Sequence, residues 1–142
     1  MGGGLLIVAV ALGAPALKEP KPHPLVGTWL ILERTQDGQT ADVRGDHCWT
    51  FTADGRRAGH TLRTRPTYWL RYEMDEKARP PAVTVTGVSF VGSPAESYDF
   101  LFKIDGDTLT VCTRERGRPA SIGAEAGSGN LVYKLRRVKA KD

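Results

Sequence analysis

The sequence predicts an all-β protein, an eight-stranded up-and-down antiparallel barrel. The chain has 142 residues, which is enough for one domain with a single core. Its 16 Gly and 9 Pro residues punctuate stretches in which apolar and polar residues alternate, the pattern of strands joined by turns. No stretch has the periodicity of an amphipathic helix. Because strands that follow one another as hairpins lose their exposed edges when the sheet closes, we favour a barrel over a two-layer sandwich.

The clearest element is a hairpin over residues 98–112. The apolar residues that alternate along its two strands are Tyr98, Phe100, Phe102, Ile104, Leu109 and Val111. Asp105, Gly106 and Asp107 lie between them, and Asp-Gly is typical of a tight turn with positive φ angles. A loop at Asp105-Gly106 pairs Phe102 with Leu109. A loop at Gly106-Asp107 shifts the pairs but keeps the apolar side chains on one face, which the other strands must cover.

The other strands are expected in order along the chain. They cover residues 25–32, 47–53, 57–63, 68–74, 83–86 and 131–138. Asp37-Gly38 ends the first of them, and Ala53-Asp54-Gly55 turns the second into the third. Residues 114–130 are rich in Gly, Ser and Arg, which predicts a long irregular loop before the last strand.

The N-terminal residues indicate export. Residues 5–16 are an apolar run of about a dozen residues, which suits the core of a signal peptide and is too short to span a bilayer. We therefore expect a signal peptide over 1–16, a Pro-rich tether with nothing to pack over 17–24, and the barrel domain over 25–139. The expected location is secreted or periplasmic, in the cell envelope, with no stable membrane span.

Alternation also predicts which side chains point into the barrel. Trp49 and Phe51 face inward on one strand, and Tyr133 and Leu135 do so on the last. The candidates for contacting a ligand in the lumen are Tyr68, Leu70, Tyr72, Val85, Phe100 and Phe102. Flat apolar walls with phenolic hydroxyl groups suit a small, partly apolar ligand. The same rings could instead fill the lumen.

Two cysteines, Cys48 and Cys112, raise the question of a disulfide in an exported protein. Alternation places Cys48 on the opposite face from Trp49 and Cys112 on the opposite face from Val111. Both therefore face outward on strands that are not neighbours in a meander, beyond the roughly 7 Å between Cα atoms that a disulfide spans. The pattern argues against a bond.

The charge distribution leaves two interpretations open. The net charge of +4 is mild and does not indicate nucleic-acid binding. No acidic residue lies between Arg56 and Glu73, and Trp69 is an outward aromatic residue in this stretch. The stretch contains five arginines, Arg56, Arg57, Arg63, Arg65 and Arg71. They form either a surface for an anionic envelope component or an ordinary solvated barrel wall.

The motifs that carry catalysis or metal binding do not occur in recognisable form. Asp105, Gly106 and Asp107 lack the further acids of a calcium loop, so a hairpin turn is the better interpretation. His23, His47 and His60 do not have the spacing of zinc ligands. From the sequence we therefore expect no metal site and no cofactor, and we do not expect the protein to be an enzyme.

Gly27-Thr28-Trp29 at the head of the first strand resembles the Gly-x-Trp signature of lipocalins and related calycin barrels. A closer resemblance covers residues 25–139, through Asp105-Gly106-Asp107-Thr108-Leu109, Arg118-Pro119 and Leu135-Arg136-Arg137. These motifs look like a small secreted lipocalin-like domain of unknown function that recurs in planctomycete proteomes. The resemblance implies an exported barrel and no particular activity.

The lipocalin resemblance also implies a structural latch at one end of the barrel. In such folds the Trp of the signature plugs the closed end, and an Arg near the last strand packs across its ring. Here the corresponding residues are Gly27, Trp29 and Arg137. We therefore expect a non-catalytic binding module with its ligand entering at the opposite end. The alternative is a structural or protein- and polysaccharide-interaction module with a packed barrel.

Overall fold

A computed structural model describes residues 21–87 and 97–139, and the predicted signal peptide lies outside these residues. The strands are β1 (Gly27–Gln36), β2 (Gln39–Asp42), β3 (His47–Phe51), β4 (Arg56–Thr61), β5 (Leu70–Asp75), β6 (Ala82–Thr86), β7 (Ser97–Asp105), β8 (Thr108–Arg114) and β9 (Asn130–Arg137). This part of the chain contains no helix, and hence none that could cross a membrane. The predicted all-β class is confirmed.

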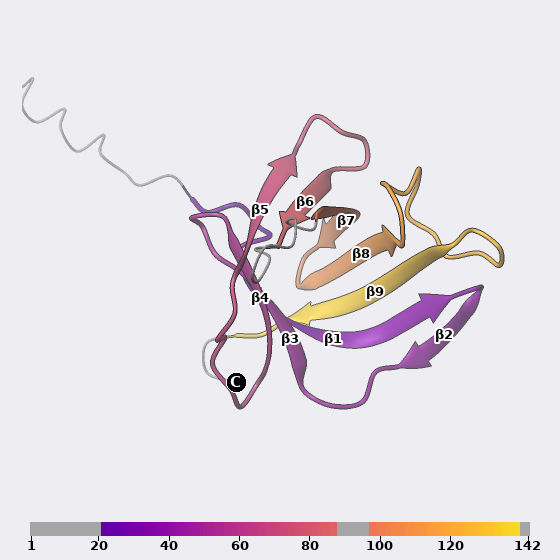
Figure 1. The fold of residues 1–142 in the computed structure, drawn as a ribbon. Coiled ribbons are helices and arrows are strands. Elements are labelled where there is room, and N and C mark those ends of the chain that lie inside the picture. The colour runs from indigo at the N-terminus through magenta and orange to yellow at the C-terminus, as the bar shows by residue number, and fades with distance from the viewer. Residues whose placement is uncertain (1–20, 88–96, 140–142) are drawn as a thin grey trace, which may run out of the picture.

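The strands close into a barrel. The sheet order is β2-β1-β3-β4-β5-β6-β7-β8-β9, and β1 also pairs with β9 (Figure 1). All neighbours are antiparallel, so the predicted up-and-down order is confirmed. The contact between β4 and β5 is the shortest one around the ring, with only the pairs Arg56–Arg71 and Arg57–Leu70.

The nine strands found in residues 21–87 and 97–139 occupy eight positions around the barrel, because β2 and β3 both pair with the same edge of β1. The first part of β1, Gly27 to Leu30, pairs with β3, and its last part, Glu33 to Gln36, pairs with β2. Asp37 and Gly38 both have positive φ, 51° and 75°, as a type I′ hairpin turn requires. The sequence predicted these two residues as the end of a strand, whereas they turn the chain directly into β2.

The central hairpin has the second of the two predicted registers. Asp105 pairs with Thr108 and Phe102 pairs with Val111, so the loop is Gly106-Asp107. Among Asp105, Gly106 and Asp107, only Gly106 has a positive φ angle, at 62°. The expectation that Asp105 also has a positive φ angle is wrong. Glycine at the first central position is the pattern of a type II′ turn, which spares the following residue a strained backbone.

The inner faces of the strands form one hydrophobic core. Its buried residues are Leu25, Trp29, Ile31, Phe51, Tyr72, Val83, Val85, Phe100, Phe102, Leu109, Val111 and Leu135. The ring of Phe51 meets Tyr72 and Phe100 edge to face, at centroid distances of 5.3 and 6.2 Å. Such contacts fill the middle of the barrel with side chains.

The long loop predicted at 114–130 spans residues 115–129, because Arg114 still belongs to β8 and Asn130 already belongs to β9. It lies along the outer wall of the barrel. We call residues 115–129 the strap. Ile122 of the strap packs over a second buried cluster, formed on the outer face by Ala82, Leu101 and Cys112. The strap also contacts the β1–β2 turn, where the Ala124 carbonyl accepts a hydrogen bond from the N–H of Gly38 at 2.6 Å.

Arg118 anchors the beginning of the strap to two strands. Its Nε donates to Oδ2 of Asp99 in β7 at 3.0 Å, and its Nη1 donates to Oδ2 of Asp75 in β5 at 3.2 Å. Thr84 in β6 donates to the other oxygen of Asp99 at 2.7 Å. The strap therefore links elements that are up to 43 residues apart in the chain.

Candidate functional site

Trp29 closes one end of the barrel. It is fully buried, and its indole Nε1 donates to the carbonyl oxygen of Leu25 at 2.9 Å. The guanidinium carbon of Arg137 lies 4.2 Å from the centroid of the Trp29 ring. Its Nη1 and Nη2 atoms donate to the carbonyl oxygens of Val26 at 3.1 Å and Pro24 at 2.6 Å. This set of contacts is the latch, and it satisfies backbone groups that precede β1.

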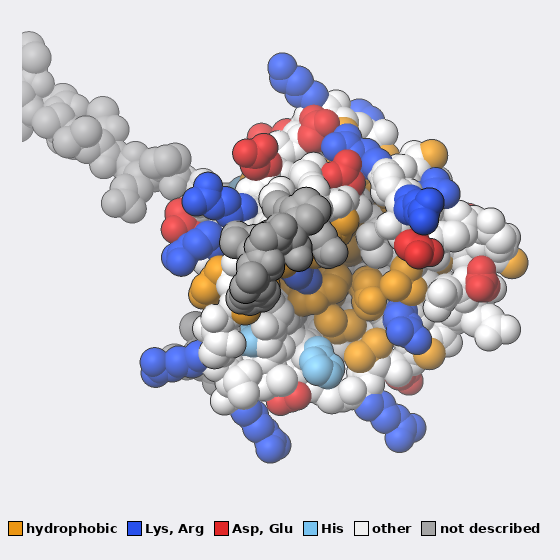
Figure 2. Space-filling view, in the orientation of Figure 1, with side chains coloured by type: hydrophobic (Ala, Val, Ile, Leu, Met, Phe, Trp, Pro, Cys, Tyr) orange, Lys and Arg blue, Asp and Glu red, His pale blue; other side chains and the backbone are white. Residues whose placement is uncertain are grey.

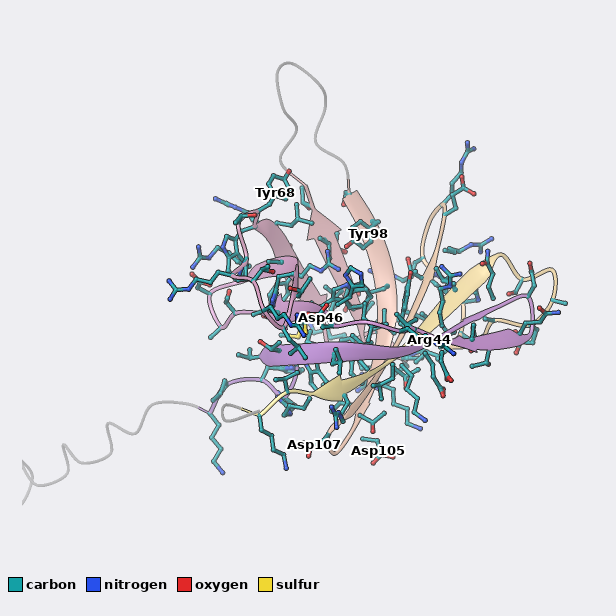
Figure 3. The ribbon with its side chains drawn as sticks, turned by 90° about the horizontal axis from the view of Figure 1, so that it is seen from below. Arg44, Asp46, Tyr68, Tyr98, Asp105 and Asp107 are labelled. Carbon is teal, nitrogen blue, oxygen red and sulfur yellow. The ribbon has the colours of Figure 1, made fainter. Side chains whose placement is uncertain are left out.

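Gly27 and Asp107 adjoin the latch. Gly27 has a φ of +138°, and a Cβ atom added to it would lie 2.9 Å from Nη1 of Arg137. The Asp107 carboxylate lies 3.5 Å from Nε of Arg137 and 3.7 Å from Nζ of Lys139. The hairpin turn thus supplies an anion to the latch. Figure 3 shows Asp105 and Asp107 at the end of the β7–β8 hairpin, opposite the end that carries Tyr98.

The last residues of the predicted tether pack against this closed end. The His23 ring lies edge-on to Phe102 with 6.1 Å between centroids, and its Nε2 lies 3.2 Å from a carboxylate oxygen of Glu76. The N–H of Leu25 donates to Nδ1 of His23 at 3.0 Å. The expectation that residues 17–24 have nothing to pack is therefore wrong at His23 and Pro24, because an imidazole ring and a carbonyl group there find partners on the barrel.

The six predicted lumen residues do not form one cavity. Tyr72, Val85, Phe100 and Phe102 are 7% exposed or less and belong to the core, and Leu70 packs against it. Tyr68 is 43% exposed and precedes β5, so its predicted inward orientation is wrong. The alternation does not extend to Tyr68 because the strand begins only at Leu70, after the irregular segment that holds Arg65-Pro66.

A small cavity lies at the end of the barrel that carries Tyr98. Its volume is about 170 Å³, and we call it the cup. The residues that line the cup are Trp49, Arg57, Tyr98, Phe100, Val111, Thr113 and Tyr133. Figure 2 shows hydrophobic side chains gathered at the centre of one face of the molecule, with basic side chains among and around them. Of the six predicted lumen residues, Phe100 is the one that reaches the cup.

Arg57 gives the cup its chemical character. Its guanidinium carbon lies 4.8 Å from the centroid of the Trp49 ring, which in turn contacts the Tyr133 ring at 5.2 Å. The Nε atom of Arg57 is buried and has no hydrogen-bond partner. Within residues 21–87 and 97–139, no carboxylate forms an ion pair with Arg57. A basic group with an unsatisfied donor thus faces a largely apolar cavity.

The electrostatics of the cup follow from this burial. Burial lowers the pKa of Arg57, and the neighbouring Tyr98 and Tyr133 oppose that effect. The guanidinium still stays protonated, since arginine starts far above neutral pH. Although Tyr98 is 38% exposed, desolvation raises the pKa of its phenol. The Tyr98 phenol is therefore neutral and can donate a hydrogen bond to an anion. Tyr133 adds a second hydroxyl group to the lining of the cup.

Arg57 does not belong to the outward arginine cluster in which the sequence placed it. Arg57 pairs with Phe51 across the β3–β4 hairpin, and paired residues point to the same face of a sheet. The neighbouring Arg56 is exposed on the outer wall, with its guanidinium carbon 5.1 Å from the centroid of the Trp69 ring. Arg71 lies directly opposite it on β5.

Sequence reasoning missed Arg57 although the signal was present. The turn at Ala53-Asp54-Gly55 was predicted, and so was the inward orientation of Phe51. A three-residue loop over 53–55 makes Arg57 the cross-strand partner of Phe51, which assigns it to the inner face. Thr113 was missed because no sequence argument extended β8 beyond Cys112. Trp49, Val111 and Tyr133 were placed inward by alternation, as they are in the cup.

Both cysteines are free and buried. Cys48 Sγ donates to the carbonyl oxygen of Asp46 at 3.5 Å, and Cys112 Sγ donates to that of Ser121 in the strap at 3.5 Å. Their strands, β3 and β8, are not neighbours in the sheet. Alternation predicted the outer face for Cys112 but not the strap that buries it. Elsewhere in the described part of the chain, no group of three His, Cys, Asp or Glu residues could hold a metal ion.

The fold and the cup define a small closed antiparallel barrel with one end plugged by a tryptophan and the other hollowed around an arginine. No protein-family model matches this chain, and no curated protein is significantly similar to it in sequence. The cup is therefore the feature of this molecule from which a function can be inferred.

Proposed function

We propose that this protein is an exported, non-catalytic, lipocalin-like binding module that holds a small, partly apolar ligand in the cup. The observation that carries the proposal is a concave, mostly aromatic cavity of about 170 Å³ at the end opposite the latch. Apolar walls with a few polar groups at defined places are the usual composition of a small-molecule site. Export is inferred from the apolar run at residues 5–16.

The size of the cup limits the ligand. An apolar cavity of about 150 Å³ accommodates benzene. The cup, at about 170 Å³, therefore suits a single ring or a short branched chain and is too small for a long acyl chain. The buried rings of Phe51, Tyr72 and Phe102 fill the space below it, so the ligand stays near the mouth.

That filled interior is also what favours the second candidate function. A barrel packed with its own side chains can serve as a rigid scaffold whose outer wall binds a partner. On that wall Arg56 stacks over Trp69 and lies opposite Arg71, a surface that suits an anionic envelope component such as an acidic polysaccharide. In this alternative the cup has no ligand.

A substitution that fills the cup separates the two functions. Thr113 lines the cup, so Thr113→Phe should block it, whereas Thr110→Phe places the same ring on the outer face of β8. Native mass spectrometry of the purified protein, and titration with small aromatic probes followed by tryptophan fluorescence, measure binding. We expect wild type and Thr110→Phe to bind and Thr113→Phe to lose binding. If wild type binds no small molecule, or if binding first appears in Phe100→Ala, the packed interaction module replaces the proposal.

A further inference from the structure

Arg57 is costly to the folded protein as it stands. Arg57 is partly buried, and the part of its guanidinium that is removed from water loses hydration that only an anion or other hydrogen-bond acceptors can replace. The buried Nε of Arg57 has no acceptor, and the residue forms none of the ion pairs found in residues 21–87 and 97–139. An aliphatic residue at this position would pack against Phe51 and Leu70, its cross-strand neighbours, without that penalty. The arginine is therefore best explained by a ligand that pairs with it.

The orientation of Arg57 leaves its donors available. One face of the guanidinium lies over the Trp49 ring, at 4.8 Å from its centroid. The N–H groups of a guanidinium lie in its plane, so stacking on a ring does not consume them. A planar fork of donors matches a carboxylate, which can accept two parallel hydrogen bonds from it. Tyr98 and Tyr133, which line the same cup and interact electrostatically with Arg57, add two hydroxyl groups.

The remaining residues that line the cup favour an apolar, ring-shaped group in the rest of the ligand. Phe100 and Val111 are almost completely buried and form apolar surface, and the Trp49–Tyr133 pair is arranged edge to face with an angle of 68° between the rings. An aromatic ring gains from such edge and face contacts beyond its hydrophobic burial. At about 170 Å³ the cup has room for one ring.

We propose that the cup binds a small aromatic monocarboxylate, with the carboxylate on Arg57 and the single ring against Trp49, Phe100 and Tyr133. This inference rests on the proposed function of the cup as a binding site. It adds the class of ligand, an anion with a one-ring apolar body, and it assigns Arg57 as the residue that determines specificity for the anion.

The test compares benzoate with benzamide, which has nearly the same shape and no charge. Both are titrated against the full chain and followed by tryptophan fluorescence and by the Nε–H signal of Arg57 in ¹H–¹⁵N spectra. We expect benzoate to bind at least about tenfold more tightly than benzamide, the ratio that one charge-assisted hydrogen bond provides. Benzoate should also shift the Arg57 signal.

Two variants assign the effect to Arg57. Arg57→Gln should reduce benzoate affinity by at least about tenfold while leaving benzamide affinity nearly unchanged. Arg56→Gln removes the adjacent exposed arginine and should change neither. Melting curves establish that each variant is folded, and the wild-type Arg57 signal provides a readout that needs no variant.

The outcomes distinguish this inference from the function on which it rests. Equal binding of benzoate and benzamide at the cup, or benzoate binding that survives in Arg57→Gln, overturns the carboxylate assignment and leaves the cup as a site for neutral rings. Absence of any binding to the wild-type cup, with no shift of the Arg57 signal at millimolar benzoate, overturns both proposals.

Discussion

Arg137 stacks on Trp29 at 4.2 Å and, in the same conformation, donates hydrogen bonds to two backbone carbonyl groups ahead of β1. One side chain on the last strand thereby holds both the ring that plugs the barrel and the segment that leads into the first strand. Because one side chain makes all of these contacts, we expect their contributions to the stability of the closed end to be coupled.

The latch predicts a large effect from a single substitution. Arg137→Ala removes the cation–π contact and leaves the carbonyl groups of Pro24 and Val26 without their donor, so we expect a loss of about 2–4 kcal/mol in the free energy of unfolding. Arg136→Ala is the matched control, since Arg136 is exposed on the same strand. Denaturant titration measures both. Equal midpoints for the two variants would show that the latch does not stabilise the fold.

Gly27 should be coupled energetically to Arg137. In wild type, Gly27→Ala places a Cβ atom 2.9 Å from Nη1 of Arg137 at a φ of +138°, and we expect a loss of about 2–3 kcal/mol. In an Arg137→Ala background the steric part disappears and about 1–2 kcal/mol of backbone strain remains. A double-mutant cycle of unfolding free energies tests this. Perfect additivity of the two substitutions contradicts the predicted contact.

Gly106 should be required for its backbone conformation alone. A Cβ atom there meets nothing within 4 Å, but its φ of +62° is unfavourable for a β-branched residue. Gly106→Val should therefore destabilise the protein by more than about 1 kcal/mol, and Thr108→Val, the same side chain two residues on, should cost less. Thermal melting compares them, and a wild-type melting curve for Gly106→Val would refute the turn geometry.

The strap should control the reactivity of Cys112. Burial raises the pKa of both thiols, so native Cys48 and Cys112 should react slowly with Ellman's reagent at pH 8. Arg118→Ala frees the strap from Asp75 and Asp99, and labelling of Cys112 should become several-fold faster while labelling of Cys48 stays unchanged.

Single-cysteine variants separate the two labelling rates, and Arg116→Ala, an exposed position on the same strap, is the control. Equal acceleration at both cysteines would mean that Arg118→Ala loosens the whole barrel. No acceleration at either would mean that the Arg118 contacts do not hold the strap down.

The Asp75–Arg118 pair predicts a pH dependence of stability. The hydrogen bond from Arg118 lowers the pKa of Asp75 in the folded state. A lowered pKa contributes stability above the unfolded value, about 3.9, and that contribution is lost as the pH falls through the folded value. The stability difference between wild type and Asp75→Asn should thus be present at pH 6 and shrink below about pH 4. Asp42→Asn, at an exposed position of β2, is the control. A difference that stays constant from pH 6 to pH 2 would contradict the assignment.

Most of the architecture could be predicted from the sequence because alternation and turn residues are local signals. Phe100 and Phe102 lie between the polar residues Asp99 and Lys103, and Gly106 marks the turn, so the hairpin and its inner face were correctly identified. The register was left between two choices, since both satisfy the same alternation. Only the tertiary structure settles which residue takes the positive φ.

The cup was harder to predict because it depends on contacts between strands that are distant in the chain. Arg57 was grouped with exposed arginines, since a charged residue is rarely expected on an inner face. Tyr68 was counted as a lumen residue, since alternation alone does not show where a strand begins. Tyr72 and Phe102 do face inward, but whether inward rings line a cavity or fill it depends on the packing of all strands together.

The latch has a consequence for how the chain folds while it is being synthesised. It joins residues that are 111 and 113 positions apart, and the β1–β9 ladder joins the two ends of the same span. During synthesis from the N-terminus, one edge of β1 stays unpaired until β9 has left the ribosome. Contacts between such distant residues form slowly, and unpaired edges promote aggregation in the meantime. A nascent chain that ends after β8 is thus an open sheet in which β1 and β8 each have an unpaired edge. The addition of β9 pairs both edges and closes the barrel.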